Sequence, residues 1–198
     1  MIILLDTPQD LSECESDLDC DVGQLLAPGT QRKLFDPSRP WAIDNGAYTT
    51  LDTPVFEALL KREWHRRADC LFVTVPDIVG CARRTAEVFD LWAPRLAGWP
   101  LALAIQDGIE HVPIPWERID AVFIGGSTPF KCGLHAERAI RAAKLFGKWV
   151  HVGRVNTPAR FEHFRKLGAD SVDGTGLARY SHMRDAIANR HDQLDLMS

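Results

Sequence analysis

Short apolar runs alternate with amphipathic segments along the whole chain. The runs begin near residues 2, 22, 41, 71, 101, 121, 149 and 171, and Asp, Gly or Pro halts most of them. Short strands that are apolar on both faces are typical of a parallel sheet covered by helices. Eight such strands predict a compact (β/α)8 TIM-type barrel in which some helices are shortened or missing. A doubly wound open sheet is the alternative.

Helix signals fall between the apolar runs. The first predicted helix has Thr53 as its N-cap, Pro54 in its first turn and Phe56 on its apolar face. The predicted helices cover 53–67, 82–96, 134–147, 157–167 and 181–190. No linker or change of composition divides the 198 residues, so we expect one domain over 1–198.

The composition is that of an ordinary water-soluble globular protein, with 45% apolar and 25% charged residues. No run approaches the 18 apolar residues of a membrane-spanning helix, and the start MIILLDTPQD lacks the basic region of a signal peptide. We therefore expect a cytoplasmic protein with no membrane partner. The five cysteines are scattered without a CxxC pair, which predicts neither disulfides nor a cysteine zinc site.

The net charge of −4 is unevenly distributed. Residues 1–31 hold seven acidic side chains and no Lys or Arg, whereas residues 131–190 hold twelve Lys or Arg against five Asp or Glu. The basic C-terminal third permits a nucleic-acid-binding face, although a solvated helical face would have the same composition.

Polar residues cluster where the predicted strands end. The segments are Asp44-Asn45-Gly46, Pro76-Asp77, Gln106-Asp107-Gly108, Gly125-Gly126-Ser127, Gly153-Arg154 and Asp173-Gly174. Ligands bind beyond the carboxyl ends of parallel strands in either architecture, so these residues are candidates for one pocket. An Asp in this position also commonly caps the next helix, and that alternative stands for Asp77 and Asp107 taken singly.

The sequence lacks other recognisable chemistry. GxGxxG, GxxxxGK[ST], HExxH and GxSxG are absent, and the seven histidines are spread out, most of them expected on the surface. We expect no metal and no cofactor. Carboxylates around a pocket with bare glycine backbone suit displacement at an anomeric carbon, with one carboxylate as nucleophile and another as acid and base.

The order WAIDNGAY, VPD, AIQDG, FIGGS and HVGRVNTPARFEHFRKLGADSVDGTG resembles the tRNA-guanine transglycosylase superfamily. The likeness spans about residues 41–180 and is greatest to the small phage-type branch that inserts 7-deazaguanine (preQ0-like) bases into DNA. It implies a (β/α)8 barrel and a base exchange through a covalent glycosyl-enzyme. The tRNA enzymes carry a zinc subdomain with three cysteines and a histidine, and no such cluster exists here, which favours DNA over tRNA.

The resemblance also implies roles for individual residues. Asp173 matches the nucleophile, Asp44 the acid/base carboxylate, and Tyr48 an aromatic residue that stacks on the base. Asp77 matches the carboxylate that accepts hydrogen bonds from the guanine N1/N2 edge. Gln106, together with the backbone of Gly125 and Gly126, matches the groups that hold the O6 side. Asn45 and the GTGLARY sequence after Asp173 differ from the tRNA enzymes.

Candidates for phosphate contacts are Arg154, Lys131, Arg179 and Arg165, and a partner protein could supply additional DNA affinity. The target guanine must be single-stranded or flipped out of a duplex. The alternatives are tRNA-guanine exchange, a free-nucleoside deoxyribosyltransferase or N-glycosidase that uses the same carboxylates, and a non-catalytic base- or nucleic-acid-binding module.

Overall fold

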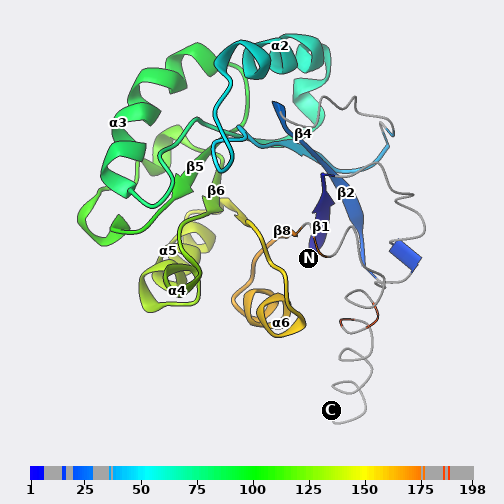
Figure 1. The fold of residues 1–198 in the computed structure, drawn as a ribbon, viewed down its shortest axis with the longest axis vertical. Helices are drawn as coiled ribbons and strands as arrows, with labels where there is room; N and C mark the ends of the chain where they lie inside the picture. Colours follow the sequence, from blue (N-terminus) through cyan, green and yellow to red (C-terminus); the bar gives the residue numbers. More distant parts are fainter. Residues whose placement is uncertain are drawn as a thin grey trace.

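Eight parallel strands close into a barrel in the order β1 to β8 (Figure 1). The structure is a computed structural model, and it describes residues 1–6, 15–16, 20–28, 36 and 38–174, together with 176, 185 and 187. The strands are β1 Ile2–Leu5, β2 Val22–Leu26, β3 Trp41–Ile43, β4 Cys70–Thr74, β5 Leu101–Ile105, β6 Ala121–Ile124, β7 Trp149–Val152 and β8 Ser171–Asp173. The predicted barrel is confirmed, and the open doubly wound sheet is wrong because β1 pairs with β8.

Helices cover the outside of the barrel (Figure 1). They are α2 Thr53–Glu63, α3 Ala82–Trp92, α4 Thr128–Lys131, α5 Leu134–Leu145 and α6 Pro158–Lys166. Short 3-10 helices cover Trp64–Asp69, Ala93–Leu96, Ile109–His111 and Trp116–Arg118. The expected helices at 53–67 and 82–96 therefore end earlier in α geometry, and each finishes as a tighter 3-10 turn.

The helix starts follow from side-chain caps. Thr157 accepts the N–H of Arg160 and caps α6 as predicted, whereas the cap of α2 is Asp52, which accepts from Val55, and not Thr53. The helix expected at 181–190 lies largely outside the described residues.

The core has two layers because the strands are apolar on both faces. Inside the barrel, Leu4, Leu25 and Phe72 pack with small alanines, and Phe123 lies against them. Outside the barrel, a larger cluster joins the opposite strand faces to the helices through residues such as Phe56 and Phe89. These side chains fill the lower interior of the barrel, and a cavity lies above them at the carboxyl ends of the strands.

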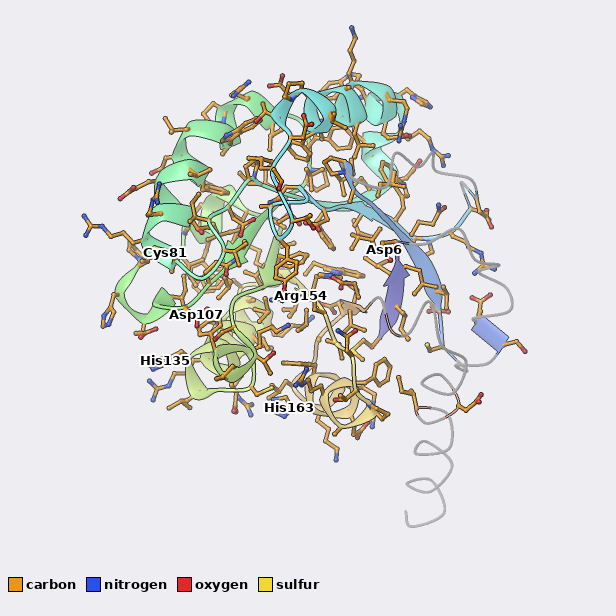
Figure 2. The ribbon with its side chains drawn as sticks, in the orientation of Figure 1. Asp6, Cys81, Asp107, His135, Arg154 and His163 are labelled. Carbon is orange, nitrogen blue, oxygen red and sulfur yellow. The ribbon has the colours of Figure 1, made fainter. Side chains whose placement is uncertain are left out.

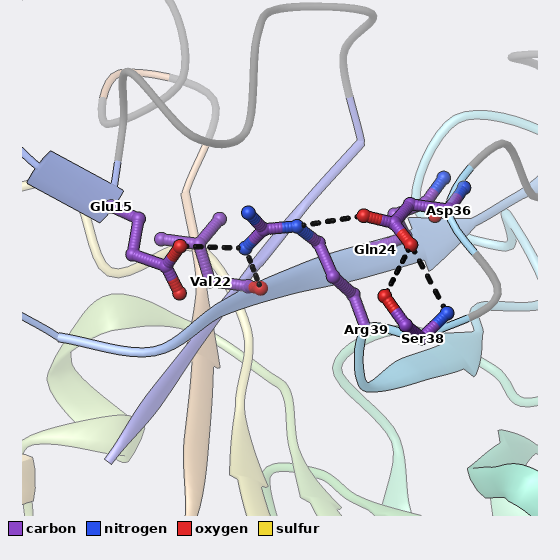
Figure 3. Close-up of polar contacts among 6 residues, drawn as sticks. All are labelled: Glu15, Val22, Gln24, Asp36, Ser38 and Arg39. Carbon is purple, nitrogen blue, oxygen red and sulfur yellow. Dashed lines mark hydrogen bonds and ion pairs between the residues drawn. The ribbon is translucent and has the colours of Figure 1, made fainter.

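Arg39 lies just before β3, at the end of the barrel opposite the carboxyl ends of the strands, and joins several segments there (Figure 3). Its guanidinium lies 3.0 Å from Glu15 and 3.1 Å from Asp36, and donates to the carbonyl of Val22 at 3.3 Å. Asp36 also accepts from the hydroxyl and N–H of Ser38. These contacts tie the segment before β3 to the start of β2, away from the ring of polar strand ends.

Candidate active site

The carboxyl ends of the strands surround a cavity of about 670 Å³. All eight strand ends contribute to its lining. One lining residue from each, in strand order, is Asp6, Ala27, Asp44, Thr74, Gln106, Gly125, Arg154 and Asp173. Figure 2 places Arg154 near the middle of the ring of strands. Cavities of this size hold small organic ligands, and here the walls combine carboxylates, amides and bare backbone.

Asp173 ends β8 and is held through both carboxylate oxygens. Its Oδ1 accepts the backbone N–H of Arg154 at 2.8 Å, and its Oδ2 lies 3.0 Å from Nε2 of His151. Gly153 lies beside it without a side chain, and a Cβ there would come within 2.7 Å of the Phe123 ring. The carboxylate is thus fixed in orientation while it still lines the cavity.

His151 is a residue that the sequence analysis missed. It is fully buried on β7, inside the barrel, with its ring 5.0 Å from that of Phe72 and 4.8 Å from that of Phe123. Its Nδ1 lies 2.9 Å from the hydroxyl of Ser171. His151 is an exception to the expectation that most histidines lie on the surface, and the signal was its place within the apolar run WVHV.

Asp44 follows β3 and lines the same cavity. Burial, followed by the negative charges of Asp173 and Asp77, raises its pKa to about 7. The backbone N–H groups of Gly46 and Asn45 oppose that shift without reversing it. A carboxyl that titrates near neutrality can both donate and accept a proton at physiological pH.

Asp77 is buried and bonded to two amides. Its oxygens accept from Asn45 at 2.8 Å and from Gln106 at 2.6 Å. Burial nevertheless raises its pKa, against these two hydrogen bonds. Asn45 also donates to the Val75 carbonyl and accepts from Ala47, so its polar groups are engaged in shaping the wall.

The side-chain oxygen of Gln106, Oε1, accepts the N–H of Gly80 at 2.9 Å. This bond orients the amide so that its nitrogen points to Asp77. Gly125 packs so closely that a Cβ would lie 2.7 Å from Gln106 Nε2. The N–H of Gly125 is taken by the Ile105 carbonyl, whereas the N–H of Gly126 has no partner in the described part of the chain. Gly126, with a φ of 74°, therefore supplies the unsatisfied donor in this wall.

Asp107 has a structural role outside the cavity lining. It accepts both the N–H and the hydroxyl of Ser127, at 2.8 Å and 2.6 Å. These bonds hold the β6–α4 turn. Burial alone would raise the pKa of Asp107, but the hydrogen bonds from Ser127 and the backbone together outweigh it and lower the pKa. Asp107 does not cap the helix that follows it, whose N-cap is Gly108, but it holds Ser127, the N-cap of α4. Of the two carboxylates, Asp77 is the one that lines the cavity.

Arg154 and Tyr48 meet at the mouth of the cavity. The guanidinium lies 3.9 Å from the centre of the Tyr48 ring and donates to the Gly126 carbonyl at 2.7 Å. Arg154 has a φ of 59°, which is uncommon for a residue with a side chain. Tyr48 is 63% exposed, so one face of its ring carries Arg154 while much of the side chain remains open to solvent.

Two of the other three expected phosphate contacts, Lys131 and Arg165, do not line the cavity. Lys131 is buried, with its Nζ 2.5 Å from the Gly153 carbonyl, and burial and then the charge of Arg154 lower its pKa to about 8. Arg165 lies in the last turn of α6, which runs back from the rim, and it pairs with Glu162. Arg179 lies outside the described residues. Burial of Lys131 and the direction of α6 correct two of the four expectations.

In the described segments, no group of three or more His, Cys, Asp or Glu side chains is arranged to hold a metal ion. None of the described helices has the length and apolar character needed to cross a membrane.

Comparison with known proteins identifies the fold. No protein family model and no curated protein matches the sequence. Tryptophan synthase from Pyrococcus furiosus is similar in structure, with a TM-score of 0.54 and 13% identity, over 95% of this chain and 96% of that one. Phosphoribosyl anthranilate isomerase from Thermus thermophilus is similar with a TM-score of 0.50 and 15% identity, over 98% of this chain and 100% of that one. A 4-hydroxy-2-oxoglutarate aldolase is similar with a TM-score of 0.52 and 15% identity, over 95% of this chain and 92% of that one. At these identities the likeness establishes a TIM-barrel fold alone.

Proposed function

We propose that this chain is a DNA-modifying pentosyltransferase that exchanges guanine in DNA for a 7-deazaguanine base. The observation that carries the proposal is the pair formed by Asp44 and Asp173 in one cavity. The pKa of Asp44 is raised to about 7, whereas Asp173 accepts an N–H at one oxygen and contacts an imidazole nitrogen with the other. Two carboxyl groups in unlike surroundings can divide the roles of acid and nucleophile.

In the first half of the exchange, a carboxylate oxygen of Asp173 attacks C1′ of the target nucleotide. A bond forms between C1′ and Asp173 while the bond from C1′ to N9 of guanine breaks. The electron pair passes into the purine, and the protonated form of Asp44 supplies the proton that guanine takes up as it leaves.

The second half reverses these steps with the new base. Asp44, now ionised, takes the N9 proton of the 7-deazaguanine, whose N9 then attacks C1′ and releases Asp173 as a free carboxylate. The number of protons on the enzyme is the same before and after the cycle. A pKa of about 7 suits Asp44 to both proton transfers.

The remaining walls match the edges of guanine. The Watson–Crick edge of guanine has N–H donors at N1 and N2 and an acceptor at O6. Each Asp77 oxygen already accepts one amide and retains a lone pair for these donors. The free N–H of Gly126 and the second N–H of Gln106 are the matching donors for O6. Tyr48 offers its open ring face to the base at the mouth.

The choice of DNA rests on the resemblance to the phage-type branch, with Arg154 as the cation best placed to meet a phosphate. Arg154 lines the cavity and has no carboxylate partner within the described ranges. A phosphodiester would offer it the charged acceptor that it lacks. Since the chain carries a net charge of −4, a partner protein that adds DNA affinity belongs to the same proposal.

The test is a base-exchange assay with DNA, tRNA and free deoxyguanosine in parallel, followed by mass analysis of the product bases. We expect 7-deazaguanine to enter DNA, and Asp173→Asn to abolish exchange without loss of the fold. Asp90→Asn serves as a matched control, because Asp90 lies on α3 in an exposed ion pair with Arg118. If exchange occurred only on tRNA or only on the free nucleoside, DNA would not be the substrate. If Asp173→Asn exchanged bases as fast as the wild type, Asp173 would not be the nucleophile.

A further inference from the structure

A chain of hydrogen bonds runs through the barrel interior to the underside of Asp173. The indole Nε1 of Trp149 donates to the Ser171 hydroxyl at 2.9 Å, and that hydroxyl lies 2.9 Å from His151 Nδ1. His151 Nε2 lies 3.0 Å from Asp173 Oδ2. All four residues belong to β7 and β8, and the strand pairing sets His151 directly beside Ser171.

The proton positions in this chain follow from the chemistry of its members. An indole nitrogen can only donate, so the Ser171 oxygen accepts from Trp149. The Ser171 hydroxyl hydrogen has one described acceptor, His151 Nδ1. With Nδ1 accepting, the neutral imidazole carries its hydrogen on Nε2 and donates it to Asp173. The opposite tautomer would direct a lone pair at the carboxylate and leave the hydroxyl hydrogen of Ser171 without an acceptor.

Packing fixes the ring of His151 in this chain. The side chain is fully buried, and its ring lies against those of Phe72 and Phe123. Its Nδ1 lies beside Ser171 and its Nε2 beside Asp173, so each ring nitrogen has a polar neighbour.

We propose that His151, held as the Nε2–H tautomer by Ser171 and Trp149, is the positioning residue for the nucleophile Asp173. The inference rests on the proposed function. His151 holds Oδ2 from below, and the Arg154 N–H holds Oδ1 from the rim, so the carboxylate plane does not rotate. Each oxygen keeps a lone pair for C1′, and attack needs little reorganisation of the enzyme.

A neutral donor also suits the covalent step. When Asp173 forms its bond to C1′, its negative charge is lost as the ester forms. A positively charged partner would favour the ionised carboxylate and oppose that loss, because the attraction between the two opposite charges disappears when the ester forms. A neutral N–H orients the nucleophile with a smaller penalty of this kind.

Three variants separate positioning from packing. His151→Phe keeps an aromatic ring between Phe72 and Phe123 but removes the N–H. His151→Gln places an amide N–H close to the original Nε2. Ser171→Ala removes the group that selects the tautomer. His163→Phe is the matched control, because His163 lies on α6 with its ring 5.0 Å from that of Phe164.

The kinetic readout is the split between kcat and KM for base exchange in DNA. We expect His151→Phe to lower kcat about 100-fold, the order of effect of a misplaced reacting group, with KM and free guanine affinity within about 2-fold. His151→Gln should recover at least about 10-fold of that loss, a rescue expected if the N–H is what matters. Unchanged kcat in His151→Phe, or equal losses in the Phe and Gln variants, would overturn the inference.

The structural readout is independent of activity. Nitrogen-15 NMR of the histidine rings should show His151 protonated at Nε2 and bare at Nδ1, and Ser171→Ala should mix the tautomers. The carboxyl carbon resonance of Asp173 should move in His151→Phe and stay fixed in His163→Phe. An Nδ1–H tautomer or an imidazolium would overturn the inference. If the wild-type chain exchanges no base, the proposed function fails, and these NMR results still decide whether His151 holds Asp173.

Discussion

Replacing Asp44 with Asn should stabilise the protein while it removes base exchange. The pKa of Asp44 is raised to about 7 from an ordinary value of 3.8, first by burial and then by Asp173 and Asp77. The folded chain therefore holds this proton more tightly than the unfolded chain does. Asn keeps a similar shape and an oxygen for the N–H groups of Gly46 and Asn45, but it carries no charge at any pH.

The sign follows from proton linkage. Between about pH 4 and pH 7 the unfolded chain releases the proton first, so the wild-type free energy of unfolding falls as pH rises. Above about pH 7 both states are ionised at this site and the loss levels off. One pKa unit corresponds to about 1.4 kcal/mol. The free energy of unfolding of Asp44→Asn should therefore exceed that of the wild type by about 4 kcal/mol at pH 8 and roughly 2 kcal/mol at pH 5, before any allowance for solvent. Because the side chain keeps some contact with the open cavity, we expect about 2–4 kcal/mol at pH 8.

The assay is urea unfolding of the wild type and Asp44→Asn at pH 5 and pH 8. The advantage of the variant should be larger at pH 8 than at pH 5, with equal m values. Asp90→Asn, which changes an exposed carboxylate on α3, is the control and should give the same small difference at both pH values. An Asp44→Asn advantage that does not grow with pH would refute the reasoning, because a buried carboxyl with a raised pKa requires that growth.

Two further predictions concern ligand binding. Asp77→Asn should weaken guanine binding by about 1–3 kcal/mol in calorimetry, since an amide there faces the donors of Asn45 and Gln106 and loses an acceptor for the base; unchanged affinity would make Asp77 a structural residue only. Arg154→Gln should lower DNA affinity, and flatten its dependence on salt, more than it lowers affinity for the free base; equal effects on both would place Arg154 outside the DNA contact.

The barrel was predictable because its signal is local and repeated. Each strand is a short, mostly apolar run, most runs are closed by Asp, Gly or Pro, and a parallel strand that is buried on both faces needs such an apolar run. Asp44, Gln106 and Asp173 were found as candidates by the same logic, because a polar residue directly after such a run lies on the rim. Their position directly at the end of one predicted strand was sufficient to identify these residues as site candidates.

The residues that prediction missed depend on pairing between strands. His151 lies within an apolar run. It is a functional candidate only because the register of β7 and β8 places it next to Ser171 and Asp173. Lys131 was taken for a surface cation, yet the short α4 turns it inward to the Gly153 carbonyl. Neither the register nor a four-residue helix can be inferred from hydrophobic periodicity, so neither contact was visible in the sequence.

The barrel closure explains how identical side chains acquire unlike properties. Asp44 follows β3, where burial and then the negative charges of Asp173 and Asp77 raise its pKa. Asp173 ends β8, where the Arg154 N–H, His151 and the charge of Lys131 surround it. An acid–base group needs the first setting and an oriented nucleophile needs the second. Since both settings depend on which strands are neighbours, moving either Asp to the opposite wall should abolish its role even though the residue type is unchanged.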